Sequence, residues 1–128
     1  MKMKLIVAGS RVLDDMLPIF SDPIVEWLDN NIKPDTVECL VSGHAKGPDR
    51  IGEIWARKHS IQIVEFIPDW DKHGNKAGPL RNKLMGDYAT HGVVFWDGVS
   101  RGSQHMHTYM LSLKKPCIIK RVSVVVDA

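Results

Sequence analysis

Short apolar runs alternate along the chain with stretches of helical periodicity. The runs are rich in β-branched residues and are bounded by glycine, proline, serine or aspartate, which is typical of strands buried on both faces of a parallel sheet. They cover Leu5–Ala8, Val37–Val41, Ile61–Ile67, Gly92–Trp96 and Cys117–Ile119. The pattern predicts five strands. A last apolar run, Val122–Val126, is either an edge strand or an exchanged arm.

Four helical stretches lie between these runs, and proline or capping residues mark their starts. Ser21-Asp22-Pro23 precedes Ile24–Leu28, Pro48-Asp49 precedes Arg50–His59, Pro79 precedes Leu80–Ala89, and Gly102-Ser103 precedes Gln104–Leu113. Within the second stretch, Ile51, Ile54, Trp55 and Lys58 recur at three- and four-residue spacing. Strict alternation of strand and helix predicts an α/β fold: a single Rossmann-like, doubly wound parallel sheet of about five strands, with residues 1–128 as one domain.

Composition agrees with one soluble domain. The chain has 128 residues, of which 44% are hydrophobic and 25% charged. Its net charge of +2 and the absence of a basic block do not favour nucleic acid as a partner. Without a membrane-length apolar run or a signal sequence, we expect a cytoplasmic protein. Cys39 and Cys117 lie in predicted strands, where we expect buried reduced thiols.

Ligands of such sheets bind beyond the carboxyl ends of the strands, so the loops after the strands are the candidate site. The first loop carries Gly9, Ser10 and Arg11. The second combines two glycines, cationic side chains and a helix start, which is typical of a phosphate site. Its candidate ligand-binding residues are Ser42, Gly43, His44, Lys46, Gly47, Asp49 and Arg50. It matches neither the dinucleotide fingerprint nor the Walker loop. The alternative for both loops is an ordinary tight turn.

Two later loops extend the candidate site. The segment from Pro68 to Asn82 is long for so small a domain and contains Trp70, Arg81 and Asn82. Trp70 either stacks on a base or packs on the core. Arg81 and Asn82 either bind phosphate and ribose or form a solvated helix face. After the fourth strand come further candidates: Asp97, Gly98, Ser100, Gly102 and Ser103. Asp97 either accepts a ribose hydroxyl or caps its turn.

Metal and nucleophilic chemistry find little support in the spacing. His105 and His107 are two residues apart on a predicted helix and face different directions, so we expect no metal site and no cofactor. Ser103 lacks the Gly-x-Ser-x-Gly context of a catalytic serine.

The loop motifs, taken together, resemble a known family. They are Ile6–Arg11, Ser42-Gly43 through Arg50 with Glu53–Ala56, Pro68–Trp70, Ala77–Met85, and Phe95–Gly98 through Gly102–Met106. In order and spacing they are similar to the YspA-type, cpYpsA-related branch of the SLOG superfamily, from residue 4 to about residue 120. The resemblance implies a Rossmann-like fold and nucleotide-type ligands. The superfamily includes Lonely Guy phosphoribohydrolases, DNA-processing protein A, and sensor domains that bind nucleotide signals or ADP-ribose derivatives.

The resemblance also bears on catalysis. The enzymes of the superfamily use an arginine in the third-helix motif and a glutamate just after a Gly-x-Gly-Thr turn. Arg81 falls on the arginine position, whereas Ser103 replaces the threonine and His105 stands where the glutamate would be. A neutral histidine supplies no negative charge to an oxocarbenium-like state, so Asp97 or Glu53 would have to substitute. If the protein is an enzyme, its catalytic candidates are Arg81, Asp97 and His105.

Three functions follow in decreasing order of support. The first is a sensor or sequestering protein for a nucleotide-type small molecule such as ADP-ribose or a cyclic nucleotide. The second is a phosphoribohydrolase or related N-glycosidase, and the third is a DNA-binding module. Because dimers are common in the superfamily, we expect a homo-oligomer. The last apolar run and four helix residues supply its interface, unless the methionines among them fill the core: Met106, Tyr109, Met110 and Leu113.

Overall fold

The computed structural model describes residues 2–10 and 21–122. Five parallel strands form one sheet in the order β3-β2-β1-β4-β5. The strands are β1 (Met3–Gly9), β2 (Val37–Ser42), β3 (Gln62–Glu65), β4 (His91–Trp96) and β5 (Cys117–Arg121). The order reverses between β1 and β4, because the chain adds β2 and β3 on one side of β1 and then crosses to the other. The predicted α/β class and parallel sheet are confirmed.

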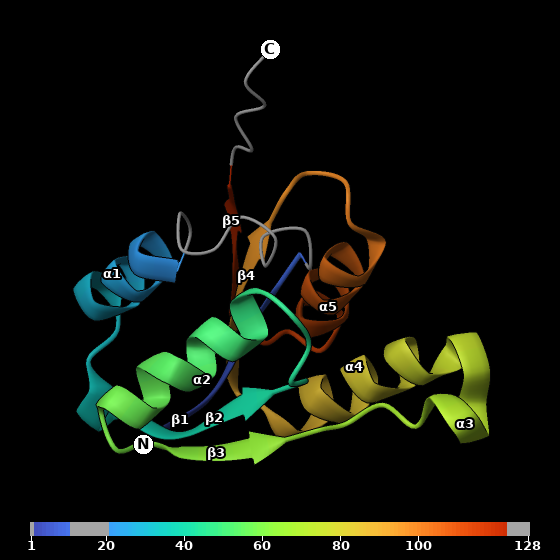
Figure 1. The fold of residues 1–128 in the computed structure, drawn as a ribbon, viewed down its shortest axis with the longest axis horizontal. Helices are drawn as coiled ribbons and strands as arrows, with labels where there is room; N and C mark the ends of the chain where they lie inside the picture. The colour runs from blue at the N-terminus through green and yellow to red at the C-terminus, as the bar shows by residue number, and fades with distance from the viewer. Residues whose placement is uncertain (1, 11–20, 123–128) are drawn as a thin grey trace.

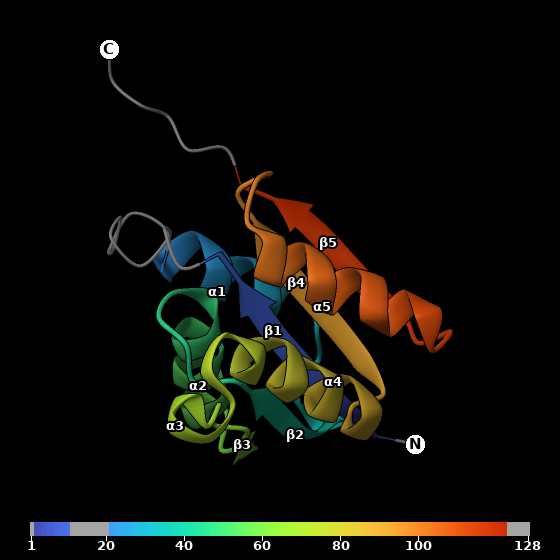
Figure 2. The ribbon, with the colours of Figure 1, turned by 90° about the vertical axis from the view of Figure 1, so that its right-hand side faces the viewer.

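Two helices cover each face of this sheet. Helices α1 (Ser21–Asn31) and α2 (Pro48–Lys58) lie on one face, and α4 (Ala77–Tyr88) and α5 (Arg101–Ser112) on the other (Figures 1 and 2). The first core layer packs α1 and α2 on alternate strand residues such as Leu5, Val7 and Leu40. The second packs Met85, Met106 and Met110 on the intervening ones. This alternation of side chains between two buried faces explains why the strand segments are continuously apolar.

The buried face of α2 differs from the apolar spacing in the sequence. Ile51 and Trp55 are buried, as the spacing suggested, but Ile54 is 53% exposed and Lys58 lies at the surface. The polar Glu53 is buried instead, at 1% exposure. The difference arises because Glu53 is hydrogen-bonded by Ser42, whose Oγ donates at 2.7 Å, so this side of the helix buries a polar pair.

The long segment after β3 contains more helix than the sequence predicted. It includes α3 (Trp70–His73) and the 3-10 turn η3 (Gly74–Lys76), and α4 begins at Ala77 rather than at Leu80. Another 3-10 turn, η2 (Pro34–Thr36), lies before β2. Asp69 caps α3 by accepting a hydrogen bond from the Lys72 N–H at 3.1 Å. The last apolar run, predicted as an edge strand or an exchanged arm, lies outside the described residues from position 123 onward.

Several smaller expectations are also resolved. Cys39 and Cys117 are both free thiols, Cys39 buried and Cys117 partly buried. Burial raises the pKa of Cys117 to about 11, so this thiol stays protonated at neutral pH. Met106 and Met110 fill the core at 1% and 0% exposure, so they supply no subunit interface, and the homo-oligomer stays a prediction. Within the described part of the chain, no helix is both long and apolar enough to cross a membrane.

Candidate functional site

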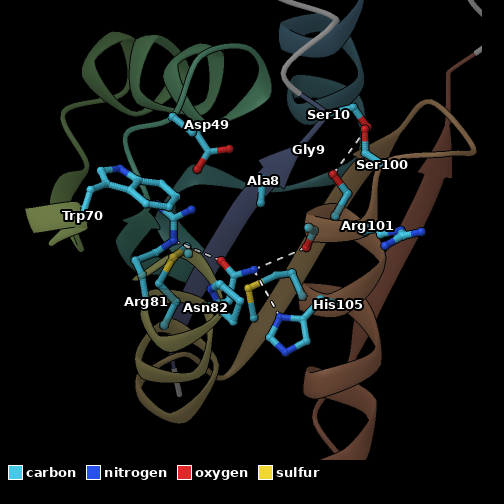
Figure 3. A pocket seen from close by; sticks show the side chains of 17 residues that line it. Ala8, Gly9, Ser10, Asp49, Trp70, Arg81, Asn82, Ser100, Arg101 and His105 are labelled. Carbon is cyan, nitrogen blue, oxygen red and sulfur yellow. Dashed lines mark hydrogen bonds between the residues drawn. The ribbon is translucent and has the colours of Figure 1, made fainter. Parts of the chain in front are cut away.

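A cavity of about 500 Å³ opens at the carboxyl end of β1, where the strand order reverses. Its volume lies within the range of roughly 300–1,000 Å³ usual for small-molecule sites. Residues from β1, α2, α3, α4 and α5 surround it (Figure 3). The larger cavity, as we call it, is lined by Ala8, Gly9, Ser10, Ala45, Asp49, Trp70, Gly78, Pro79, Arg81, Asn82, Met85, Ser100, Arg101, Gly102, Ser103, His105 and Met106.

The loop after β2 borders this cavity and is held by two charged side chains from elsewhere in the fold. The Gly43 N–H donates to Asp49 Oδ2 at 3.1 Å, and Arg81 Nη1 donates to the Gly43 carbonyl at 2.8 Å. A Cβ at position 43 would lie 2.3 Å from Arg81 Nη1, which explains the glycine. Because Asp49 belongs to α2 and Arg81 to α4, the loop ties together helices on opposite faces of the sheet.

Asp49 is a buried carboxyl in the wall of the larger cavity. Burial raises its pKa to about 6, against the lowering effects of Arg81 and of the backbone N–H groups of Gly43, Gly9 and Ala45. Its side chain is therefore close to half-protonated in mildly acidic solution. Among the residues that the structure describes, Asp49 is the one carboxylate that lines the larger cavity.

A chain of hydrogen bonds joins α4 to the start of α5. Arg81 Nε donates to Asn82 Oδ1 at 3.0 Å, and Asn82 Nδ2 donates to the Gly102 carbonyl at 3.3 Å and lies 3.4 Å from His105 Nδ1. Burial, with a smaller effect from Lys83, lowers the pKa of His105, which favours the neutral imidazole. The network fixes the direction of the Arg81 guanidinium and places the His105 imidazole beside Asn82.

The loop after β4 is held by its own residues. Asp97 accepts hydrogen bonds from the Val99 N–H at 2.9 Å, the Ser100 N–H at 2.8 Å and Ser100 Oγ at 3.0 Å. Partial burial by itself would raise the pKa of Asp97, but these bonds outweigh it and lower the pKa. Of the two predicted roles of Asp97, a ribose contact and a turn cap, these bonds correspond to the turn cap. Ser10 joins this loop to β1, because the Asp97 N–H donates to Ser10 Oγ at 3.0 Å.

A smaller cavity of about 280 Å³ adjoins the larger one. Trp70, Arg81 and Ala45 line both cavities, so these side chains form a shared wall. Trp70 is 46% exposed rather than sealed into the core. The remaining lining combines two cationic side chains, Lys46 and Arg50, with His44, Gly43, Ile67 and Pro68. A ligand with two bulky or anionic parts has room on both sides of the shared wall.

The structure thus brings most of the predicted site residues to one region. Gly9, Ser10, Asp49, Trp70, Arg81, Asn82, Ser100, Gly102, Ser103 and His105 line the larger cavity, and Gly43, His44, Lys46 and Arg50 line the smaller one. Ser42, Gly47, Asp97 and Gly98 line neither, and Arg11 lies outside the described residues.

Sequence reasoning missed several wall residues. Arg101 begins α5, and its place beside Ser100 in a glycine-rich loop was a usable signal. Ala45, Gly78 and Pro79 lie next to predicted site residues along the chain, whereas Met85 and Met106 reach the cavity from the core and carry no local signal.

Comparison with known proteins agrees with the motifs found in the loops. A family model described as the YspA, cpYpsA-related SLOG family matches residues 3–73. The chain is also similar to the Gene 61 protein of Mycobacterium phage D29, with 31% identity over 108 residues, which span 80% of this chain and 83% of the phage protein. No solved structure matches the chain at a comparable level.

Proposed function

Because this chain belongs to the YspA, cpYpsA-related SLOG family, we propose that it binds a phosphate-bearing nucleotide or a nucleotide-derived signal in the larger cavity. Membership in this family indicates a nucleotide-related function. We further propose that residues 1–128 act as one such binding unit, as a sensor or a sequestering protein.

The observation that carries the proposal is that the N-terminal turn of α5 lines the larger cavity. Its first residues, Arg101, Gly102 and Ser103, line the wall, and no acidic residue lies in its first turn. The first N–H groups of a helix have no partner within the helix and bear partial positive charge, which favours an anion there. Arg101, which is exposed, adds a full positive charge to this end of the helix. We place a phosphate against this turn.

The rest of the ligand follows from the opposite wall. The exposed ring of Trp70 offers a stacking surface for a base, and the Arg81 guanidinium beside it offers planar donors to a second phosphate or to ribose. The smaller cavity, with Lys46 and Arg50, extends this surface beyond the shared wall. Two adjoining compartments with cationic walls favour a ligand with two parts, such as ADP-ribose or a cyclic dinucleotide, over a nucleoside monophosphate.

A second candidate function is favoured by Asp49. An N-glycosidase needs a carboxyl group near the sugar, and a group whose pKa is raised to about 6 can give or accept a proton near neutral pH. Asp49, rather than Asp97 or Glu53, is the carboxylate in the wall of the larger cavity. In this alternative, Asp49 takes the part played by the glutamate in the superfamily's enzymes, beside Arg81.

The test is to incubate the protein with AMP, ADP-ribose, NAD, cyclic ADP-ribose and cyclic dinucleotides, and to analyse bound and free pools by mass spectrometry. We expect one two-part ligand to be retained and recovered intact. Arg81→Ala and Arg101→Ala should each weaken its binding by on the order of 30-fold, the effect of losing a charged contact of about 2 kcal/mol. Arg81→Lys is the matched variant that keeps the charge but not the planar donors.

The outcomes separate the candidates. Release of a free base, lost in Asp49→Asn, would replace the binding function by the N-glycosidase. Retention that is unchanged in both alanine variants would contradict the placement of the ligand in the larger cavity.

A further inference from the structure

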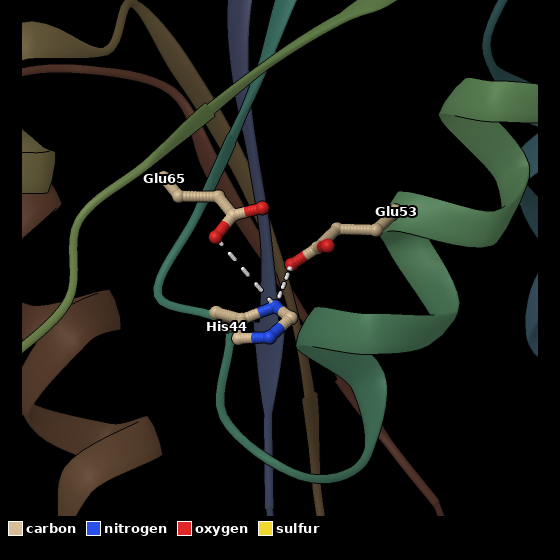
Figure 4. A group of neighbouring side chains, drawn as sticks. All are labelled: His44, Glu53 and Glu65. Carbon is tan, nitrogen blue, oxygen red and sulfur yellow. Dashed lines mark hydrogen bonds and ion pairs between the residues drawn. The ribbon is translucent and has the colours of Figure 1, made fainter.

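Three metal-ligating side chains converge beside the smaller cavity, at the carboxyl ends of β2 and β3 (Figure 4). His44 follows β2, Glu53 lies on α2 and Glu65 ends β3. His44 Nδ1 lies 2.8 Å from Glu53 Oε2 and 3.8 Å from Glu65 Oε2. One nitrogen and two carboxylate oxygens, all within 4.8 Å of one another, thus approach a common point.

The most buried member of this group is Glu53. The Glu53 side chain is only 1% exposed, and a buried carboxylate is stable only when it is paired or ligates a cation. Arg57 lies 3.2 Å from the other oxygen of Glu53, Oε1, and is itself 61% exposed to water. The Oε2 atom of Glu53 faces His44 and Glu65 and accepts a hydrogen bond from Ser42 Oγ at 2.7 Å, so this oxygen is held in position to ligate a cation together with them.

We propose that His44, Glu53 and Glu65 form a binding site for a divalent transition-metal cation of the Zn²⁺ class. Imidazole nitrogens and carboxylate oxygens are both ligands of such ions, at about 2.0–2.2 Å from the metal, which puts tetrahedral ligand atoms about 3.4 Å apart. The observed separations of 2.8 and 3.8 Å lie on either side of that value, so small side-chain movements bring all three into coordination.

Neighbouring groups hold the ligands in place, as metal sites require. Ser42 Oγ donates to Glu53 Oε2 at 2.7 Å, and the His44 N–H donates to Ser42 Oγ at 3.0 Å. The backbone of His44 has a φ of 54°, in the left-handed region. The side chains of His44 and Glu65 are each 39% exposed, which leaves an entry path and a fourth coordination position open to solvent.

Spacing along the sequence gives no sign of this site. The ligands come from a loop, a helix and a strand, so no His-x-x-x-His or Cys-x-x-Cys pattern arises. The expectation of no metal rested on residue spacing along the chain, whereas these ligands come together only when the fold brings residues 44, 53 and 65 to one place.

The test is titration of the metal-free protein with Zn²⁺, and with Co²⁺ as a spectroscopic substitute. We expect one equivalent to bind, with Co²⁺ giving the visible absorption of a four-coordinate nitrogen- and oxygen-ligated ion. Glu65→Gln and His44→Asn should each weaken binding by at least about 10–100-fold. Asparagine tolerates the left-handed backbone at position 44, and Glu53 is left intact because its burial makes its substitution a folding test.

Two exposed residues outside the cluster provide matched controls, Glu26→Gln and His73→Asn. Both controls should bind Zn²⁺ as the unmodified protein does, and circular dichroism should show that all four variants are folded. Three results would each overturn the proposal: no saturable binding of Zn²⁺, binding that survives in both cluster variants, or equal losses in the controls.

Discussion

The two glycine-rich loops that border the larger cavity are held in different ways. The loop after β2 is held from outside, by Asp49 of α2 and Arg81 of α4 on either side of Gly43. The loop after β4 is held mainly from within, by Asp97 and by Trp96, whose Nε1 donates to the Ser100 carbonyl at 3.0 Å. It also contacts the residue that follows β1, through the bond from the Asp97 N–H to Ser10 Oγ. Similar sequence signals thus produce one loop that depends on the assembled fold and one that largely supports itself.

The carboxyl groups of the two loops also differ in their pKa values. Burial raises the pKa of Asp49 to about 6, whereas hydrogen bonds lower the pKa of the less buried Asp97. Folding therefore favours the protonated form of Asp49, because the carboxyl is buried, and the ionised form of Asp97, because of its hydrogen bonds. Three changes to these loops test the contrast, from the largest expected effect to the smallest.

Asp49→Asn should have the largest effect, through pH. With a folded pKa of about 6 and an ordinary value of 3.8, Asp49 contributes stability that is complete below about pH 4 and is lost as pH rises through 6. The difference corresponds to about 3 kcal/mol. The free energy of unfolding of Asp49→Asn, minus that of the unmodified protein, should rise by up to that amount between pH 4 and pH 7 in urea titrations. A difference that does not change with pH would contradict the raised pKa.

Gly43→Ala should break the external support of the first loop. Its Cβ would lie 2.3 Å from Arg81 Nη1 and 2.8 Å from Cζ, so the guanidinium must move and lose its bond to the Gly43 carbonyl. We expect a loss of about 2 kcal/mol in the free energy of unfolding, and weaker nucleotide binding that resembles that of Arg81→Ala. Gly102→Ala is the control for stability, since a Cβ there meets nothing within 4 Å. Its stability should stay the same or rise by up to about 1 kcal/mol. Equal losses in the free energy of unfolding of the two variants would contradict the proposed difference between the loops.

Asp97→Ala should have a smaller effect on stability, confined to the second loop. The Val99 N–H, Ser100 N–H and Ser100 Oγ lose their shared acceptor, at a cost of about 1 kcal/mol, as for the loss of a helix cap. Because the pKa of Asp97 is lowered, its contribution is present above the ordinary aspartate pKa and is lost as pH falls through the folded value. Thermal unfolding at pH 7 and in acid measures this loss, which should shrink in acid, opposite to the trend for Asp49. A loss of stability in Asp97→Ala that grows in acid would contradict the lowered pKa of Asp97.

Local signals were enough to predict the strands, the parallel sheet and the family. The apolar runs such as Val37–Val41 are bounded by turn residues, and burial on both faces keeps them continuously apolar. Helix starts were predicted less well, because Pro79 suggested a beginning at Leu80 whereas the helix begins at Ala77. Proline is accepted anywhere in the first turn of a helix, so it does not identify the first residue.

The roles of single site residues depended on distances that no local pattern contains. Asp97 and Glu53 were the carboxylates considered for catalysis, yet Asp49 is the one in the wall of the larger cavity. Its position depends on the Gly43 loop, which in turn depends on Arg81, 38 residues later in the chain. The role of His44 depends in the same way on Glu53 and Glu65.

The central place of β1 in the sheet has a consequence for the order of folding. One edge of β1 pairs with β2, but its other edge stays open until β4 is available, and the contact from the Lys4 N–H to Thr90 Oγ1 joins residues 86 positions apart. Such late closure of a long chain segment slows folding. During synthesis, a chain that ends before α5 already contains the Gly43 loop but lacks one whole wall of the larger cavity. A ligand in that cavity thus stabilises only the completed fold, and shifts the population toward it by mass action.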